Sequence, residues 1–62
     1  MPMKPIEMDR LLKKHGFIVA RQNGSHRFYF NPNTKKTTIV PIHAQELKLG
    51  TEQKILKDAG LK

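Results

Sequence analysis

An Asn-Gly dipeptide at residues 23 and 24 constrains the fold of this chain more than any other feature of its sequence. It lies between two runs rich in aromatic and β-branched residues, and Asn-Gly in that position is the strongest short-range signal for a β-hairpin. Turn-forming residues, Asn31 to Thr34, follow the second run and lead into a third run that Pro41 ends. The strands that we expect are Phe17 to Gln22, Ser25 to Phe30 and Thr37 to Val40.

A helix is predicted on each side of these strands. Apolar residues recur at helical spacing from Pro5 to His15, and again in a segment that Thr51 can cap and that runs through Ala59. A glycine follows each segment, and glycine is the residue that most often ends a helix. The order α-β-β-β-α predicts an α+β fold in two layers, with a three-stranded antiparallel sheet and both helices on one face. The chain has room for one domain, residues 1–62.

The pairing of the first hairpin decides which side chains lie under the helices. With Asn23 and Gly24 as the loop residues, Arg21 lies opposite His26, and both stand at the rim of the buried face. Tyr29 then points to the opposite face. A three-residue loop with a bulge is the alternative, and it would shift the pairing. The residues of this hairpin expected in the core are Phe17, Val19, Phe28 and Phe30.

Positive charge is concentrated in the middle of the chain. Twelve lysines and arginines stand against five acidic residues, which gives a formal net charge of +7. From Arg10 to Gln45 there are seven of these cations and no acidic residue. Such a field attracts polyanions, of which nucleic acid is the most common in a cell. A lysine-rich surface without a specific partner is the plainer alternative, but it would scatter its charges.

The composition excludes several kinds of site and several locations. The chain has no cysteine, which excludes disulfides and a thiolate metal site, and it has no cluster of carboxylates for a divalent metal. Its longest apolar run, Phe17 to Ala20, is far too short to cross a bilayer, and its first five residues do not resemble a signal peptide. We therefore expect a cytoplasmic protein with no metal, no small-molecule cofactor and no membrane partner.

Four short motifs follow one another along the chain. A glycine-serine-histidine motif occupies residues 24–26, with Arg21 three residues before the glycine and aromatic residues after the histidine. The other motifs are His15-Gly16-Phe17, then Val40-Pro41-Ile42-His43 with Glu46-Leu47, and finally Ile55-Leu56-Lys57-Asp58-Ala59-Gly60-Leu61. In this order they resemble the motifs of the HicA toxins, and the resemblance covers nearly the whole chain. That family often has tryptophan where this chain has Phe17, a packing change that leaves the chemistry untouched.

The resemblance implies a double-stranded-RNA-binding-like fold and the activity of an mRNA interferase, an endoribonuclease that halts growth. It implies that His26 is the catalytic residue. It also implies a type II toxin–antitoxin system, in which a HicB-type antitoxin covers the active site. The expected partners are therefore mRNA and that antitoxin.

The chemistry of RNA cleavage explains the need for histidine and arginine independently of the resemblance. RNA carries its own nucleophile, the 2′-hydroxyl, so a protein need only move protons and stabilise the phosphate. An imidazole suits proton transfer because the reference pKa of histidine, about 6.5, is close to neutral pH. Guanidinium binds phosphate bidentately, so we expect Arg21, on the face of His26, to stabilise the transition state and Arg27 to bind the RNA backbone. Gly24 and Ser25 are expected to shape the turn or to contact a phosphate, and no metal should be needed.

Other residues are weaker candidates. His43 is either an auxiliary acid or a structural residue of a turn. Lys35 and Lys36 are candidate auxiliary contacts to RNA, because they extend the run of positive charge. Tyr29 is the one aromatic residue that we expect to be free to stack on a base.

Two other functions are compatible with the charge. One is a non-catalytic RNA-binding module, although the second helix lacks the lysine cluster with which such domains usually bind duplex RNA. The other is a small basic interaction protein, for example an assembly factor on the ribosome, which would not need His26. Cleavage assays on the wild type and a His26 variant separate these alternatives.

Overall fold

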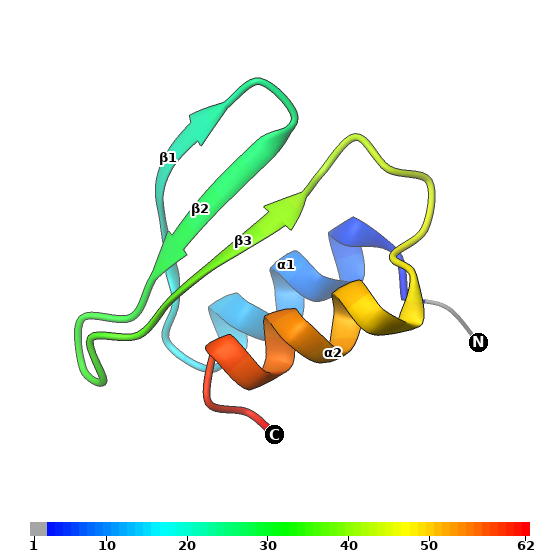
Figure 1. Cartoon of the computed structure of the whole chain (residues 1–62). Helices are drawn as coiled ribbons and strands as arrows, with labels where there is room; N and C mark the ends of the chain where they lie inside the picture. Colours follow the sequence, from blue (N-terminus) through cyan, green and yellow to red (C-terminus); the bar gives the residue numbers. More distant parts are fainter. Residues whose placement is uncertain (1–2) are drawn as a thin grey trace.

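The computed structural model describes residues 3–62 and has the order of helices and strands predicted from the sequence (Figure 1). Pro5 begins the first helix, where its missing N–H costs nothing, and the side chain of Glu7 accepts a hydrogen bond of 2.8 Å from the backbone N–H of Lys4. The elements are α1 (Pro5–Lys14), β1 (Ile18–Asn23), β2 (His26–Phe30), β3 (Thr37–Pro41) and α2 (Leu49–Asp58).

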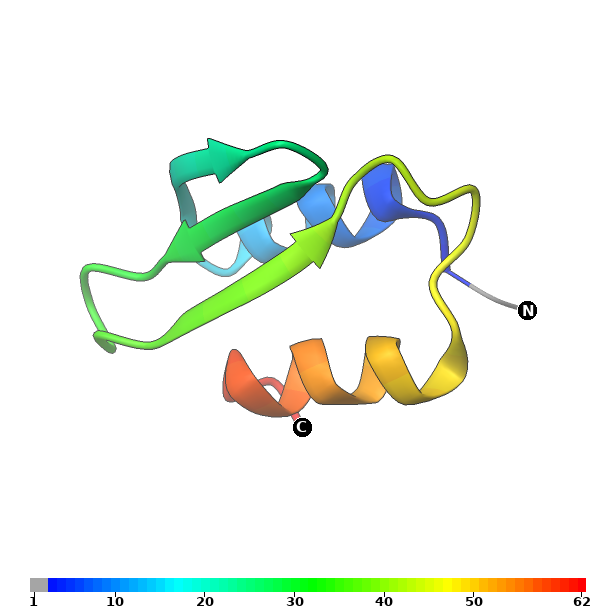
Figure 2. The same cartoon turned by 45° about the horizontal axis from the view of Figure 1, so that its top comes forward.

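The three strands form one antiparallel sheet in the order β1-β2-β3, and both helices lie on the same side of it (Figures 1 and 2). Both helices contact β3. Figure 2 shows the two layers, with α2 running below the sheet. The predicted α+β arrangement is confirmed. Among residues 3–62, no helix covers the other side of the sheet.

The tight turn of the first hairpin lies one residue later than predicted. Gly24 and Ser25 are the loop residues, because Asn23 is already paired with His26. Gly24 has a φ of 62°, a value that glycine adopts at little cost. The glycine therefore occupies the first loop position rather than the second. The shift changes the cross-strand partner of Arg21 by two residues, from His26 to Phe28, so it does not by itself move a side chain to the other face.

The helices cover the face of β2 opposite to the one predicted. Tyr29, predicted to point away from the helices, is fully buried, whereas Phe28 and Phe30, predicted for the core, are half-buried on the other side of the sheet. Val19 was also expected in the core, but it lies next to a β-bulge in the edge strand β1 and is 40% exposed. We call the uncovered side of the sheet, which bears Arg21, His26, Phe28, Phe30 and Ile39, the open face.

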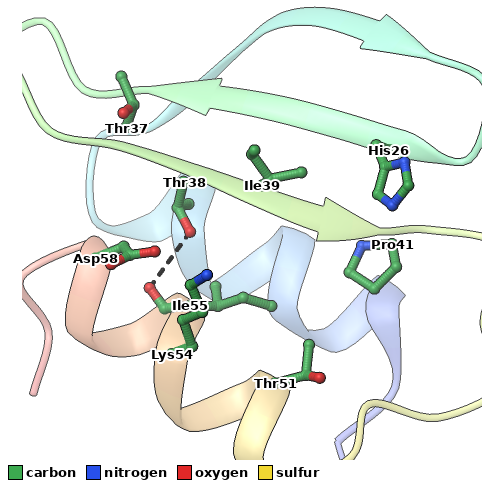
Figure 3. Close-up of a pocket in the computed structure, with 9 residues that line it drawn as sticks. All are labelled: His26, Thr37, Thr38, Ile39, Pro41, Thr51, Lys54, Ile55 and Asp58. Atoms are coloured by element: carbon green, nitrogen blue, oxygen red, sulfur yellow. Dashed lines mark hydrogen bonds between the residues drawn. The ribbon is translucent and has the colours of Figure 1, made fainter.

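The core lies between the sheet and the two helices. Phe17 belongs to it, as predicted, and the backbone N–H of Phe17 donates a hydrogen bond of 2.9 Å to the carbonyl of Leu12 as α1 ends. In β3, Thr38 points toward α2 and Ile39 points away from it (Figure 3). The buried apolar residues are Met8, Leu12, Phe17, Tyr29, Val40, Leu47, Ile55 and Ala59.

The second helix begins earlier than its expected cap. It starts at Leu49, with Lys48 in the N-cap position, so Thr51 lies inside the first turn and does not cap it. The segment before the helix is held by the backbone N–H of Leu47, which donates a hydrogen bond of 2.7 Å to the carbonyl of Met3. Tertiary contacts thus set the start of α2 in place of a side-chain cap.

Because Tyr29 faces the helices and Phe28 faces away from them, truncating these two residues should lower the free energy of unfolding by different amounts. Tyr29→Ala removes a fully buried side chain, so it should lower the free energy of unfolding by about 3–5 kcal/mol. Phe28→Ala removes a half-buried ring on the open face and should cost less than half as much. Urea unfolding followed by circular dichroism measures both values. A larger loss for Phe28→Ala would contradict this assignment of faces.

Candidate active site

His26 is held in place by the turn that precedes it and by the end of β3. It begins β2 directly after Ser25, and it pairs with Pro41, the last residue of β3. The backbone N–H of Ile42 donates a hydrogen bond of 2.8 Å to the carbonyl of Ser25, which ties the turn to the chain that leaves β3. Two strand ends therefore fix the backbone of His26, while its side chain is exposed.

The imidazole of His26 lies beside Pro41 and lines a groove of about 450 Å³ between the sheet and α2 (Figure 3). The groove follows β3, and Asp58 lies toward its other end. A polymer can enter such a site from the side, because the groove opens along the edge of the sheet. Besides His26, the groove is lined by Thr37, Thr38, Ile39 and Pro41 of β3 and by Thr51, Lys54, Ile55 and Asp58 of α2.

One stripe of α2 forms the far wall of this groove. Its residues stand at positions 51, 54, 55 and 58, the i, i+3, i+4, i+7 spacing of a single helix face. The hydroxyl of Thr38 donates a hydrogen bond of 3.4 Å to the carbonyl of Ile55, which joins the stripe to β3 (Figure 3). The sequence analysis did not select Lys54, the one lysine among the lining residues. Its spacing of three residues from Thr51, the predicted cap, was the signal that could have identified it.

Arg21 lies on the same side of the sheet as His26, as predicted, but one pair further along, and both lie on the open face rather than at the rim of the helix-covered face where they were expected. Arg21 pairs with Phe28, and its guanidinium carbon lies 4.5 Å from the centre of the Phe28 ring. Arg21 and His26 are thus diagonal neighbours on the open face, a separation of typically about 7–8 Å. A second hollow, of about 400 Å³, lies at Arg21 and Phe28 and shares three residues of β3 with the groove. The two hollows therefore adjoin.

The remaining predicted residues lie at different distances from the groove. Gly24 is exposed in the turn, with space around its Cα. The Nζ of Lys35 lies 5.9 Å from the centre of the Phe30 ring, on the open face, whereas the side chain of Lys36 lies against Gly60. His43 is exposed in the segment between β3 and α2 and does not line the groove.

The comparisons with known proteins agree with the motifs. A family model described as the HicA toxin of bacterial toxin–antitoxin systems matches residues 7–61. This chain belongs to the HicA toxin family. The match includes the glycine-serine-histidine motif and the whole of α2, so the resemblance inferred from the sequence is confirmed. No individual curated protein matches the chain significantly.

In this HicA toxin Arg27 points to the side of the sheet opposite His26, as predicted. Its Nη1 lies 3.4 Å from Oδ1 of Asp9, a carboxylate of α1 that is only 6% exposed. The hydroxyl of Tyr29 donates a hydrogen bond to the same oxygen, and Nζ of Lys13 lies 3.1 Å from Oδ2. Three donors therefore surround one buried carboxylate. Arg27 is half-buried on the helix side of the sheet and is bonded to Asp9.

The hydrogen bond between Tyr29 and Asp9 favours the ionised form of the carboxyl group and the neutral form of the phenol. Burial raises the pKa of Asp9, but the hydrogen bonds from Tyr29 and Lys13 and the nearby positive charges lower it by more, so its pKa lies below 3.8. Burial, together with the hydrogen bond to Asp9, raises the pKa of Tyr29 from 10.0 to about 12. At neutral pH the carboxylate is ionised and the phenol is neutral.

Two further features concern metals and membranes. Within residues 3–62, no group of three or more histidine, aspartate and glutamate side chains is arranged to hold a metal ion. In the same part of the chain, no helix has the length and hydropathy needed to span a bilayer.

The contact between Asp9 and Tyr29 predicts a loss of stability at both ends of the pH scale. Because the pKa of Asp9 is lowered by folding, its contribution is present above about pH 4 and is lost as the pH falls. Because folding raises the pKa of Tyr29 to about 12, its contribution is present below pH 10.0 and is lost as the pH rises toward 12. Urea midpoints measured across this range test both statements.

The control is Tyr29→Phe, which keeps the ring and removes the ionisable group. Its midpoint should fall less than that of the wild type between pH 10 and about 12, the pKa of Tyr29 in the folded state. Equal alkaline losses in the two proteins would mean that Tyr29 does not titrate as described.

Proposed function

We propose that this HicA toxin is an endoribonuclease that cleaves mRNA, with His26 as the catalytic residue. One observation carries the proposal: the imidazole is exposed and lines an open groove that also contains Lys54. Arg21 adds a second permanent cation on the same side of the sheet. His26 thus shares a groove with one cation and a side of the sheet with another, and an acid–base group and cations are the kinds of residue that cleavage of a phosphodiester requires. An mRNA substrate also accounts for the expected cytoplasmic location.

The proposed reaction uses the RNA's own 2′-hydroxyl as nucleophile. His26 accepts the proton of this hydroxyl as its oxygen attacks the adjacent phosphorus. Arg21 and Lys54 bind the phosphate oxygens, on which negative charge increases in the transition state. The bond to the 5′-oxygen then breaks, and that oxygen takes up a proton. The products end in a 2′,3′-cyclic phosphate and a 5′-hydroxyl, and no metal ion takes part in these steps.

The other candidates take supporting roles in this proposal. Arg27 was expected to bind the RNA backbone, but its contact with Asp9 favours a structural role beneath the sheet. Lys35, on the open face, is better placed to meet a phosphate. Gly24 and Ser25 hold the turn that carries His26, and His43 is retained only as an auxiliary candidate.

Substitution of His26 should abolish most of the activity. With labelled single-stranded RNA and EDTA present, His26→Ala should cleave about 10²–10⁴-fold more slowly than the wild type, because the proton transfer is lost. The 5′ product of the wild-type reaction should carry a cyclic phosphate, and a 2′-deoxynucleotide at the scissile position should block it. Rates from denaturing gels and end-group analysis by mass spectrometry measure these outcomes.

The matched control is His15→Ala, which removes an exposed imidazole at the end of α1, outside the groove. It should cleave like the wild type, and all three proteins should have the same circular dichroism spectrum. Equal rates for His26→Ala and the wild type would contradict the catalytic assignment. Binding of RNA without cleavage by any of them would favour the non-catalytic RNA-binding module.

The partner that we propose is a HicB-type antitoxin that covers His26 with its own carboxylates. The sheet and its turns, residues 18–41, contain four lysines and arginines and no acidic residue, so an acidic partner fits them. The rate of association between toxin and antitoxin should fall when the salt concentration is raised, because salt screens charge steering. Surface plasmon resonance at low and high salt measures this rate. A rate that does not change with salt would argue against recognition by charge.

A further inference from the structure

The open face carries two aromatic rings that the protein covers only in part. Phe28 and Phe30 stand at alternate positions of β2, the central strand, and point away from the helices. Ile39 pairs with Phe28 across β3 and is 45% exposed. A small protein that places two phenylalanines outside its core keeps apolar area available for contact with another molecule.

A cation lies over each of these rings. The guanidinium carbon of Arg21 is 4.5 Å from the centre of the Phe28 ring, and the Nζ of Lys35 is 5.9 Å from the centre of the Phe30 ring. The backbone of Lys35 itself has a φ of 65°, a conformation that non-glycine residues rarely adopt. The surface therefore presents flat apolar groups together with positive charge.

Negative charge is kept away from this surface. The acidic residues lie in α1, in α2 and in the segment between β3 and α2, and none lies in the strands or turns of residues 18–41. The hollow at Arg21 and Phe28 also adjoins the His26 groove through β3. A chain bound on the open face would therefore continue directly into the groove.

We propose that the open face is a subsite for single-stranded RNA, on which Phe28 and Phe30, with the cations above them, stack against the bases that flank the scissile phosphate. The inference rests on the proposed nuclease function and deepens it. Stacking on aromatic rings and on guanidinium planes is how proteins bind unpaired bases, and cations nearby bind the phosphates. Bases in a duplex have no free face to offer, so the subsite selects single strands.

Binding to an uncleavable single strand tests this subsite separately from catalysis. A 2′-O-methyl oligonucleotide lacks the nucleophile, and its affinity is measured by fluorescence anisotropy. Phe28→Leu and Phe30→Leu should each weaken binding by about tenfold, since stacking contributes about 1–3 kcal/mol per base. A 2-aminopurine base in the oligonucleotide should be quenched on binding to the wild type and less so on binding to either variant.

Two controls separate loss of stacking from loss of structure. Phe17→Leu makes the same change at a buried ring under the helices, and it should bind RNA like the wild type. Phe28→Tyr keeps an aromatic ring on the open face and should restore binding. Lys35→Gln should reduce the salt dependence of binding, by ~0.7 in the slope of log K against log[salt], whereas Phe30→Leu should leave that slope unchanged.

The outcomes distinguish this subsite from the nuclease itself. If the wild type cleaves RNA but both leucine variants bind the uncleavable strand as tightly as it does, the subsite is wrong and the nuclease stands. If the leucine variants lose affinity for the antitoxin but keep their affinity for RNA, the open face is a protein interface and the subsite is wrong. If the wild type neither cleaves nor binds single strands, both proposals fail.

Discussion

The buried contact between Asp9 of α1 and Tyr29 of β2 decides which face of the sheet meets the helices. A carboxylate that is 6% exposed needs donors, and Tyr29 and Arg27 supply them from alternate positions of one strand. Once these two residues face α1, the residues between and before them must face the other way. The exposed position of His26 at the groove is therefore a consequence of a hydrogen-bonded contact on the opposite side of the sheet.

Much of the fold follows from local signals in the sequence. The glycines that end both helices and the turn residues between the strands mark the elements to within a few residues, because each acts on its own neighbours. The choice of face does not follow in this way. The alternation in β2 offers two faces that both contain aromatic residues, and hydropathy alone favours Phe28 and Phe30 over Tyr29. Only the partner Asp9, distant in sequence, reverses that preference, and a one-residue shift of the turn accompanies it.

The sequence predicted correctly that the candidate site residues share a side of the sheet, but it did not predict which side the helices leave uncovered. Arg21 and His26 share a side in the predicted pairing and in the observed one, because a turn shifted by one position changes the cross-strand partner by two residues. Lys54 was not predicted, since its place in the groove depends on how α2 packs against β3. That packing is a tertiary relation, visible in the sequence only as a helical stripe that begins at Thr51 and includes the core residue Ile55.

The same contact that orients the sheet also separates charge across it. Asp9 is the acidic residue that bonds directly to the sheet, and its carboxylate is matched there by Arg27 and Lys13 on the helix side. An unpaired carboxylate at this depth would cost stability and would weaken the positive potential that the strands present to RNA. With the pairing in place, Arg21 and Lys35 act on the open face, and residues 18–41, which form the strands and their turns, contain no acidic residue. A residue that bonds α1 to β2 thus contributes indirectly to the attraction of a polyanion on the far side of the sheet.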